Sequence, residues 1–228
     1  MTNKTYVISL GGSLIVPKEG IDVKFLKKFR ALILAEIKKG NRFFIITGGG
    51  VTCRNYVYSA DKIVKISDED KDWLGIHSTR LNAHLMRTVF FDVANPEIIT
   101  NPTKPFSAKG KIIIAGGWRP GWSTDYVATV LAEKYKIKNI VNLTNTDYVC
   151  DKDPKKFKDA KIIEKIDWKN FRKIVGNKWI PSLNMPFDPI ASQKAEKLNL
   201  EVAIMNGANL NNFKNFLNGK KFKGTKIG

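Results

Sequence analysis

The chain has 228 residues, of which 43% are hydrophobic and 26% are charged. This composition is typical of a folded globular protein and excludes a disordered chain. No apolar run reaches the roughly 18 residues that a membrane-spanning helix needs. With only Cys53 and Cys150, the chain lacks a disulfide framework and zinc-type spacing.

Short apolar runs alternate with helical patterns, which predicts a parallel or mixed sheet with crossover helices. Strands are expected at residues 5–10, 42–47, 112–115, 139–143 and 202–205. Helices are expected at residues 22–39, from about 51 onward, and at 68–91, 124–135 and 188–198. Asp22 is a candidate N-cap of the first helix and Gly40 its expected end. A boundary between two lobes of a single domain is expected near residues 110–120.

Glycines follow three of the predicted strands, at Gly11-Gly12-Ser13, Gly48-Gly49-Gly50 and Gly116-Gly117. Glycine lets the backbone approach a ligand closely, and a following helix offers free N–H groups to a phosphate. One such cluster is more simply a tight turn, but three in equivalent positions favour a phosphate site at the carboxyl ends of the strands. Neither a Rossmann fingerprint nor a Walker-type loop is present.

Charged side chains accompany these loops. Arg54 lies about one turn into the helix after Gly50, where its guanidinium could fork onto a phosphate. Asp125 stands where a helix begins, and it could orient a cation, hold a metal or only cap the helix. Asp153, before Pro154, is equally open between a ligand contact and a common turn.

These motifs together resemble the amino acid kinase superfamily and, within it, the uridylate kinases of the archaeal-type branch. The resemblance spans nearly the whole chain in the family's order. The matching residues are Leu10–Ser13, Gly48–Gly50 with Arg54, Asp72–Gly75, Thr79-Arg80, Asn82-Ala83, Gly116–Asp125, Leu143–Asp147, Asp153–Lys155, Asp188-Pro189 and Gly224–Ile227. The stretch Gly116–Asp125 is the most diagnostic of uridylate kinases.

The resemblance implies a three-layer α/β/α sandwich with a mainly parallel central sheet. It implies transfer of the γ-phosphoryl group of ATP to UMP, with Mg²⁺, in pyrimidine nucleotide synthesis. It also implies a homo-oligomer, possibly a hexamer, and one domain whose residues 1–117 bind the acceptor and whose residues 118–228 bind ATP. The start of the chain lacks the layout of a signal peptide, so a cytoplasmic protein without a membrane partner is expected.

The resemblance also assigns site residues. Those expected to bind UMP are Gly49, Asp72, Trp118, Arg119, Pro120, Gly121, Trp122, Ser123 and Thr124. Those expected to bind ATP are Gly12, Ser13, Gly50, Arg54, Thr144, Asn145, Cys150 and Asp153. Asp125 is expected to organise the reaction centre, with Arg54 beside it. No protein metal ligand is predicted, and His77 and His84 are better explained as packing or exposed residues.

Ser9 departs from the pattern of many superfamily members, which carry a lysine two residues before the first glycine pair. The loss removes a positive charge from the transferring phosphoryl group, which can cost roughly 10³-fold in rate. Arg119 lies in the loop that should cover the phosphates. We therefore hypothesise that Arg119 supplies part of that charge and is the third catalytic residue.

The sequence also departs from the family pattern in both the expected ATP site and the expected UMP site. Tyr148 replaces a glycine, which predicts a changed or strained turn, and Cys150 replaces the aromatic ring expected against adenine. Trp118 and Trp122 are bulkier than residues expected in the acceptor loop. Two interpretations stay open for them: stacking on the base, or packing at a subunit contact.

Three alternatives to a uridylate kinase stay open on the sequence. A kinase of another small acceptor, such as isopentenyl phosphate, is disfavoured by Val51-Thr52-Cys53, where those kinases place a histidine. A nucleotide-binding regulatory or storage protein without catalysis is supported by Ser9, Tyr148 and Cys150. Nucleic acid binding would follow from the net charge of +18. The lysines are spread along the whole chain, however, and compositional bias explains them better.

Overall fold

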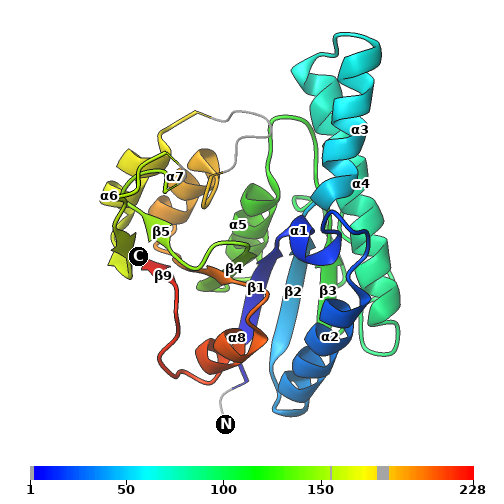
Figure 1. The fold of residues 1–228 in the computed structure, drawn as a ribbon. Helices are drawn as coiled ribbons and strands as arrows, with labels where there is room; N and C mark the ends of the chain where they lie inside the picture. The colour runs from blue at the N-terminus through cyan, green and yellow to red at the C-terminus, as the bar shows by residue number, and fades with distance from the viewer. Residues whose placement is uncertain (1–2, 155, 179–184) are drawn as a thin grey trace.

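The computed structural model describes residues 3–154, 156–178 and 185–228. Lys155, part of one matching motif, lies outside the described residues. The core is a seven-stranded sheet in the order β3-β2-β1-β4-β8-β9-β7 (Figure 1). Its strands are β1 (Thr5–Leu10), β2 (Arg42–Thr47), β3 (Ile112–Ala115), β4 (Asn139–Thr144), β7 (Lys165–Ile166), β8 (Glu201–Asn206) and β9 (Thr225–Ile227).

All neighbouring strands of this sheet are parallel except β8 and β9. The carboxyl ends of β1, β2, β3 and β4 therefore meet at one edge, which is where α/β sheets gather ligands. The sheet is continuous across the boundary expected near residue 117, because β1 pairs with β4 from Val7 opposite Ile140 to Leu10 opposite Leu143. A separate two-stranded sheet contains β5 (Val149–Cys150) and β6 (Ile162–Ile163).

Helices cover both faces of the sheet and make the three layers (Figure 1). One face packs against α1 (Gly12–Ile15), α2 (Val23–Lys38), α4 (Asp68–Val89) and α8 (Leu210–Leu217). The other face packs against α5 (Thr124–Lys134), α6 (Trp168–Val175) and α7 (Pro189–Lys197). The predicted α/β/α sandwich with a mainly parallel sheet is thereby confirmed.

Burial of large apolar side chains stabilises each layer. Phe29 of α2 stacks on Phe213 of α8 at 6.4 Å between ring centroids and meets Phe90 edge-on at 6.3 Å. All three rings are fully buried. Burial of each such side chain contributes roughly 1.5–3 kcal/mol. These contacts pack α2, α8 and the end of α4 against one another on one face of the sheet.

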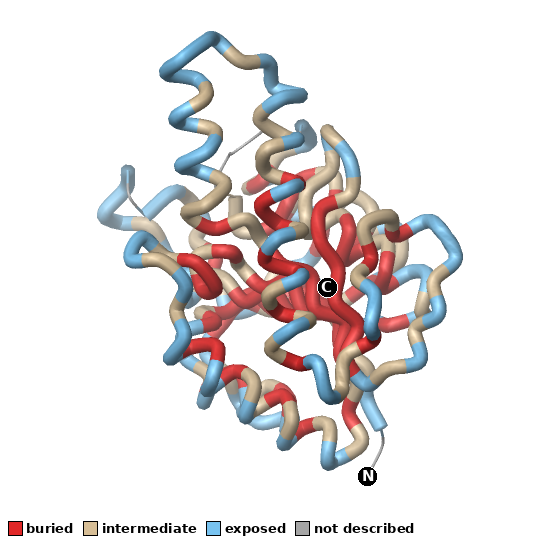
Figure 2. Tube along the Cα trace, turned by 90° about the vertical axis from the view of Figure 1, so that its right-hand side faces the viewer, coloured by how far each residue is buried: buried red, intermediate tan, exposed pale blue. Residues whose placement is uncertain are grey.

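The helical pair α3 (Gly50–Ile63) and α4 extends beyond the body of the molecule (Figure 1). The projecting part is mostly exposed, in contrast to the buried sheet (Figure 2). In α3 the only buried residue is Gly50, at the first position of the helix. The base of this pair is therefore anchored in the core, whereas its tip is held mainly by contacts between the two helices.

Most boundaries agree with the sequence patterns. The Asp22 side chain accepts a hydrogen bond from the Phe25 N–H at 2.8 Å, and Gly40 ends the helix with φ at +96°. The sequence patterns did not predict α6, α8 or the strands β5, β6, β7 and β9. These strands have two or three residues each, which is too short to show an alternating pattern.

Candidate active site

The first two glycine loops touch each other at the carboxyl edge of the sheet. A Cβ atom on Gly12 would lie 2.0 Å from the Gly50 nitrogen and 2.6 Å from the Gly48 carbonyl carbon. Gly50 has φ at +67°, a conformation that favours glycine. Only glycine at these positions allows the two loops to approach so closely.

The same loops present backbone donors. Within the described residues, no hydrogen bond is recorded for the N–H groups of Gly12, Ser13, Gly49 and Gly50. Gly11 is instead tied to β4, since its N–H donates to the Leu143 carbonyl at 2.8 Å. Free N–H groups at the starts of helices are the usual partners of phosphate oxygens. The predicted convergence of Gly12, Ser13, Gly49 and Gly50 is thus consistent with the arrangement of the backbone.

The third glycine loop, residues 116–124, is held by three side chains of α4. The Thr79 hydroxyl accepts from the Gly117 N–H at 2.7 Å. Arg80 donates to the carbonyls of Gly117 and Trp118 at 3.1 and 2.8 Å. The Asp72 carboxylate accepts from the Gly121 N–H at 2.7 Å. The loop that the resemblance assigns to the acceptor is therefore held by hydrogen bonds from one helix, which also supplies Asp72.

Four side chains of this loop and of α5 form a stack. The Arg119 guanidinium lies 4.3 Å from the Trp118 ring centroid and 5.7 Å from that of Trp122. Trp122 in turn packs on Tyr126 with 4.0 Å between centroids. Arg119 is exposed and keeps its planar donors free at the loop surface. Stacking of the two indoles on a base, or on a second subunit, stays a prediction.

Asp125 lies in the first turn of α5, whose N-cap is Ser123. Its Oδ1 accepts from the Ser9 hydroxyl at 2.8 Å, and its Oδ2 accepts from the Asp188 N–H at 3.2 Å. Burial raises the pKa of Asp125 to about 7, and the charge of Asp188 adds to the rise, although these two hydrogen bonds oppose it. Part of the Asp125 residue reaches the surface, but its carboxyl group is enclosed.

Asp188 is a site residue to which the sequence analysis gave no role. It is 4% exposed, and its Oδ1 caps α7 by accepting from the Ala191 N–H at 2.5 Å. Its other carboxylate oxygen is buried and has no hydrogen-bond partner among the described residues. Burial raises the pKa of Asp188 as well. The Asp188-Pro189 pair was the only sequence signal that could have pointed to it.

On the donor side, Thr144 is the last residue of β4 and Asn145 follows it, next to the first glycine loop. The Thr144 hydroxyl donates to the Asn145 side-chain oxygen at 3.4 Å, and Asn145 is exposed. Cys150 lies in β5, and the Asp153 carbonyl begins a turn by accepting from the N–H groups of Lys156 and Phe157. No contact recorded between described residues joins Cys150 or Asp153 to the glycine loops.

Backbone dihedral angles test the strain predicted for the turn at Tyr148. Among the described residues other than glycine, only Lys136 and Asn199 have positive φ. Tyr148 therefore does not occupy the left-handed region that a glycine would favour. The turn at Tyr148 is therefore free of this kind of backbone strain, and a change in the path of the turn stays a prediction.

The Arg54 side chain is exposed on α3. Among the described residues, no hydrogen bond or ion pair is recorded for its guanidinium. Its guanidinium is free to meet an anion near the glycine loops. Within the same residues, no cluster of three or more His, Cys, Asp or Glu side chains could hold a metal ion.

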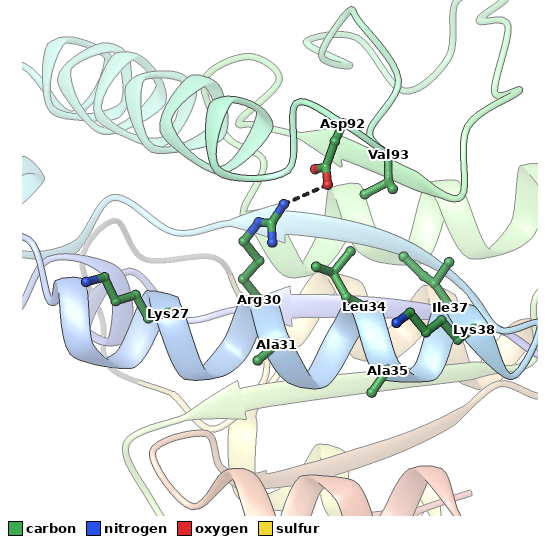
Figure 3. A pocket seen from close by; sticks show the side chains of 9 residues that line it. All are labelled: Lys27, Arg30, Ala31, Leu34, Ala35, Ile37, Lys38, Asp92 and Val93. Carbon is green, nitrogen blue, oxygen red and sulfur yellow. Dashed lines mark hydrogen bonds and ion pairs between the residues drawn. The ribbon is translucent and has the colours of Figure 1, made fainter.

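One open hollow of about 620 Å³ lies away from these loops, along α2 and the segment after α4 (Figure 3). The Arg30–Asp92 ion pair crosses it at 2.7 Å, and Lys27 and Lys38 stand at its rim (Figure 3). None of the predicted site residues lines this hollow. The candidate active site is accordingly defined by the loops at the carboxyl edge of the sheet.

Comparison with known proteins agrees with this geometry. The sequence pattern of the amino acid kinase family matches residues 4–206. The chain belongs to the amino acid kinase family. A uridylate kinase of Methanospirillum hungatei is 33% identical over 226 residues, covering 98% of this chain and 94% of the relative. One of Thermoplasma volcanium is 34% identical over 221 residues, covering 96% and 95%.

Solved structures of the family share the fold. The crystal structure of uridylate kinase from Archaeoglobus fulgidus has a TM-score of 0.82 and 27% identity, covering 98% of this chain and 99% of the other. The UMP kinase of Bacillus anthracis, at 22% identity and a TM-score of 0.78, shows the likeness of the fold alone. Within the described residues, no helix is both long and apolar enough to cross a membrane.

Proposed function

We propose that this amino acid kinase transfers the γ-phosphoryl group of ATP to UMP and releases ADP and UDP. The observation that carries the proposal is the loop at residues 116–124, which α4 holds against the glycine loops through Asp72, Thr79 and Arg80. Full-length similarity to uridylate kinases supports the choice of acceptor.

On the acceptor side, Gly49 and the loop from Trp118 to Thr124 would enclose UMP, and Asp72 would accept from the ribose hydroxyls. Asp72 already accepts a backbone N–H at 2.7 Å and is partly exposed, so its second carboxylate oxygen is available to a ligand. Ser123 and Thr124 stand at the start of α5, where N–H groups and the helix dipole favour a phosphate.

On the donor side, the N–H groups of Gly12, Ser13 and Gly50 would hold the phosphates of ATP, and Thr144, Asn145, Cys150 and Asp153 would line its adenosine. The two proposed lobes, acceptor-binding at residues 1–117 and ATP-binding at 118–228, are therefore interleaved at the site. Gly49 and Asp72 of the first half would meet UMP together with the loop from Trp118 to Thr124 of the second half, and the ATP residues come from both halves. Mg²⁺ would enter with the nucleotide as MgATP, because the ion bridges phosphate oxygens and neutralises their charge.

Transfer would proceed in line, from the β,γ-bridging oxygen of ATP to a phosphate oxygen of UMP. The bond to ADP breaks as the bond to UMP forms, so no covalent enzyme intermediate is needed. Free backbone N–H groups, Arg54 and Arg119 would stabilise the negative charge on the transferring group. Asp125 would organise the donors around it. The remaining proposals, a homo-oligomer of up to six chains and a cytoplasmic location, rest on the resemblance alone.

The decisive experiment is an ADP-release assay with MgATP and, in turn, UMP, CMP, dUMP, AMP and isopentenyl phosphate. Turnover with UMP in preference to the other acceptors is the expected result. No turnover in protein that still binds UMP by calorimetry would instead support a binding protein without catalysis. Turnover of isopentenyl phosphate alone would assign a different acceptor.

The two arginines can be separated in the same assay. Arg54→Ala and Arg119→Ala are each expected to lower kcat by about 10²-fold or more, because each removes a cation from the transition state. Full kcat in Arg119→Ala, beside a large loss in Arg54→Ala, would show that Arg119 does not replace the missing lysine. Light scattering of the purified chain measures its assembly independently of activity.

A further inference from the structure

Ser9 lies on β1, at the position next to Leu10, where the strand enters the first glycine loop. It is 5% exposed and is paired in the sheet with Ile46 of β2 and Asn142 of β4. Its hydroxyl donates to Asp125 Oδ1 at 2.8 Å. Because sheet neighbours fix the Ser9 backbone on both sides, this hydrogen bond holds the Asp125 carboxyl group in one orientation.

Asp188, the N-cap of α7, contacts the same carboxyl group through its backbone. Its backbone N–H donates to Asp125 Oδ2 at 3.2 Å, which brings the two buried carboxyl groups together. Asp188 Oδ1 accepts from the Ala191 N–H, and the Ser123 side chain and the Ile190 N–H also hydrogen-bond to this carboxylate. Among the described residues, Asp188 Oδ2 has no partner within hydrogen-bond geometry. An unpaired buried carboxylate oxygen is costly, and the cost increases when a second carboxylate is close.

Among the described residues, no cation is recorded beside either carboxyl group. The ion pairs recorded for the described residues include neither Asp125 nor Asp188. The groups that act on the charge of Asp125 are thus Ser9, from β1, and Asp188, from the segment before α7. Ser9 favours the charged form through a hydrogen bond, and the carboxylate of Asp188 disfavours it through like charge.

We propose that Ser9 and Asp188 are opposing positioning residues for Asp125, with the Ser9 hydroxyl supporting its carboxylate and the Asp188 carboxylate opposing it. The like charge of Asp188 then favours the protonated form of Asp125, and the Ser9 hydroxyl favours the charged form. In this arrangement the charge on Asp125 depends on the balance between two neighbours. The effect on catalysis rests on the proposed kinase function, whereas the effect on protonation does not.

Burial raises the pKa of Asp125 to about 7, so both protonation states are populated near neutral pH. Removal of the like charge in Asp188→Asn is expected to lower the pKa of Asp125 by about one unit. Removal of the hydroxyl in Ser9→Ala is expected to raise it by about one unit. Shifts of the Asp125 pKa in opposite directions in the two variants would support the proposal, because a merely structural role would not produce them.

The primary experiment is a ¹³C NMR titration of aspartate carboxyl groups in the ligand-free full chain, with Asp125→Asn used to assign the Asp125 signal. Asn caps helices about as well as Asp, so Asp188→Asn should keep α7 intact. Asp22→Asn is the matched control, since Asp22 caps α2 through Phe25 in the same way and has no recorded contact with Asp125. Ser9→Thr, which keeps the hydroxyl, should restore the wild-type titration.

The pH dependence of kcat with UMP is the second readout. The part of the pH–kcat profile that reflects the titration of Asp125 should shift to lower pH in Asp188→Asn and to higher pH in Ser9→Ala. It should not shift in Asp22→Asn. Equal titration of Asp125 in wild type and both variants would overturn the proposal. Absence of UMP turnover in the wild type would refute the proposed function instead, and the NMR titration would still decide this inference.

Discussion

The acceptor and donor sides of the candidate site are built differently. The acceptor loop is held by three side chains of α4: the adjacent Thr79 and Arg80, and Asp72 about two turns before them. The donor segment after β4 is held at its ends, where the Gly207 N–H donates to the Thr144 carbonyl at 2.8 Å and the Val149 N–H donates to the Thr225 hydroxyl at 2.8 Å. Between these ends, residues 145–147 are exposed, and the side-chain contact recorded is the long hydrogen bond from Thr144 to Asn145 at 3.4 Å.

This difference indicates that the acceptor loop is more preorganised than the donor segment. A loop held by charge-assisted and buried hydrogen bonds needs little ordering when its ligand binds. The donor segment, by contrast, leaves more of its ordering to the nucleotide itself. Acceptor recognition should consequently be sensitive to single substitutions, and donor recognition should be more tolerant of them.

The largest effect is expected at the junction of the two sides. Gly12→Ala places a methyl group 2.0 Å from the Gly50 nitrogen, so the two glycine loops must separate. We expect a loss of about 3 kcal/mol in the free energy of unfolding and activity below a hundredth of wild type. Urea denaturation and the ADP-release assay measure the two quantities.

Gly75→Ala is the matched control. Gly75 lies inside α4, and a Cβ there meets only the Cys53 sulfur at 3.5 Å, an ordinary contact. Alanine in a helix interior is favoured over glycine by roughly 1 kcal/mol, so this variant should keep or gain stability. Equal stability of the two variants would mean that the loops are not in firm contact.

Asp125→Asn tests the pair of carboxyl groups that lies between the two sides. Asp125 has a folded-state pKa raised from 3.8 to about 7, so the folded state binds more protons than the unfolded state in that window. The free energy of unfolding of the wild type should consequently fall as pH rises through the window. Because the residue is partly exposed, we expect Asn to recover only about 2 kcal/mol at pH 8.

The measurement is thermal unfolding of both proteins between about pH 4 and pH 8, the range over which the linkage acts. An asparagine can point its oxygen at the Asp188 N–H and its amide at Ser9, so it satisfies both existing partners. The advantage of the variant should shrink toward the acid end. A constant difference across the range would contradict the raised pKa of Asp125.

Arg80→Lys should weaken the acceptor side selectively. Arginine reaches the carbonyls of Gly117 and Trp118 with two nitrogens, and lysine cannot reproduce that fork. We expect the KM for UMP to rise by about tenfold, which corresponds to roughly 1.4 kcal/mol, with the KM for ATP little changed. Initial-rate kinetics with each substrate varied in turn provide the test.

Arg30→Lys is the control for this substitution, because Arg30 also contacts a carbonyl, that of Val89, but lies at the hollow on α2. It should leave both KM values within about twofold of wild type, as surface changes usually do. If Arg80→Lys raises the KM for ATP as strongly as that for UMP, the proposed division between the sides is wrong.

The smallest effect is expected on the donor side. Cys150→Phe restores a ring where the resemblance expects one against adenine, and an aromatic contact contributes about 1 kcal/mol. The KM for ATP should therefore fall by about fivefold, with the KM for UMP unchanged. Fluorescence titration with ATP would check the same change in the absence of UMP, and an unchanged ATP affinity would show that Cys150 does not face the adenine.

The longer strands and most of the helices followed from the sequence, whereas α6 and α8, of eight residues each, did not. Strands of four to six residues that end in glycine, at Leu10, Thr47 and Ala115, were predicted at their observed places. The contact of Ser9 with Asp125 was not, because the two residues are 116 positions apart. That contact depends on how α5 returns across β1, which no local pattern specifies.

The acceptor side shows the same limit. Asp72 and the loop at Gly121 were assigned together through the resemblance, but the roles of Thr79 and Arg80 as anchors of the loop were not assigned. Both residues belong to a motif that carries the resemblance, but an adjacent threonine and arginine fit any helix. Their partners are backbone atoms of Gly117 and Trp118, so side-chain chemistry alone could not indicate the pairing.

The contact between Gly12 and Gly50 has a consequence for how such a chain can diverge. No larger residue can replace glycine where the two backbones touch, because even one added methyl group displaces both loops. Diversification of substrate choice must then fall on residues outside this contact, such as Trp118, Trp122, Tyr148 and Cys150. A saturation library scored for growth should lose almost every variant at Gly12 and retain many at Tyr148.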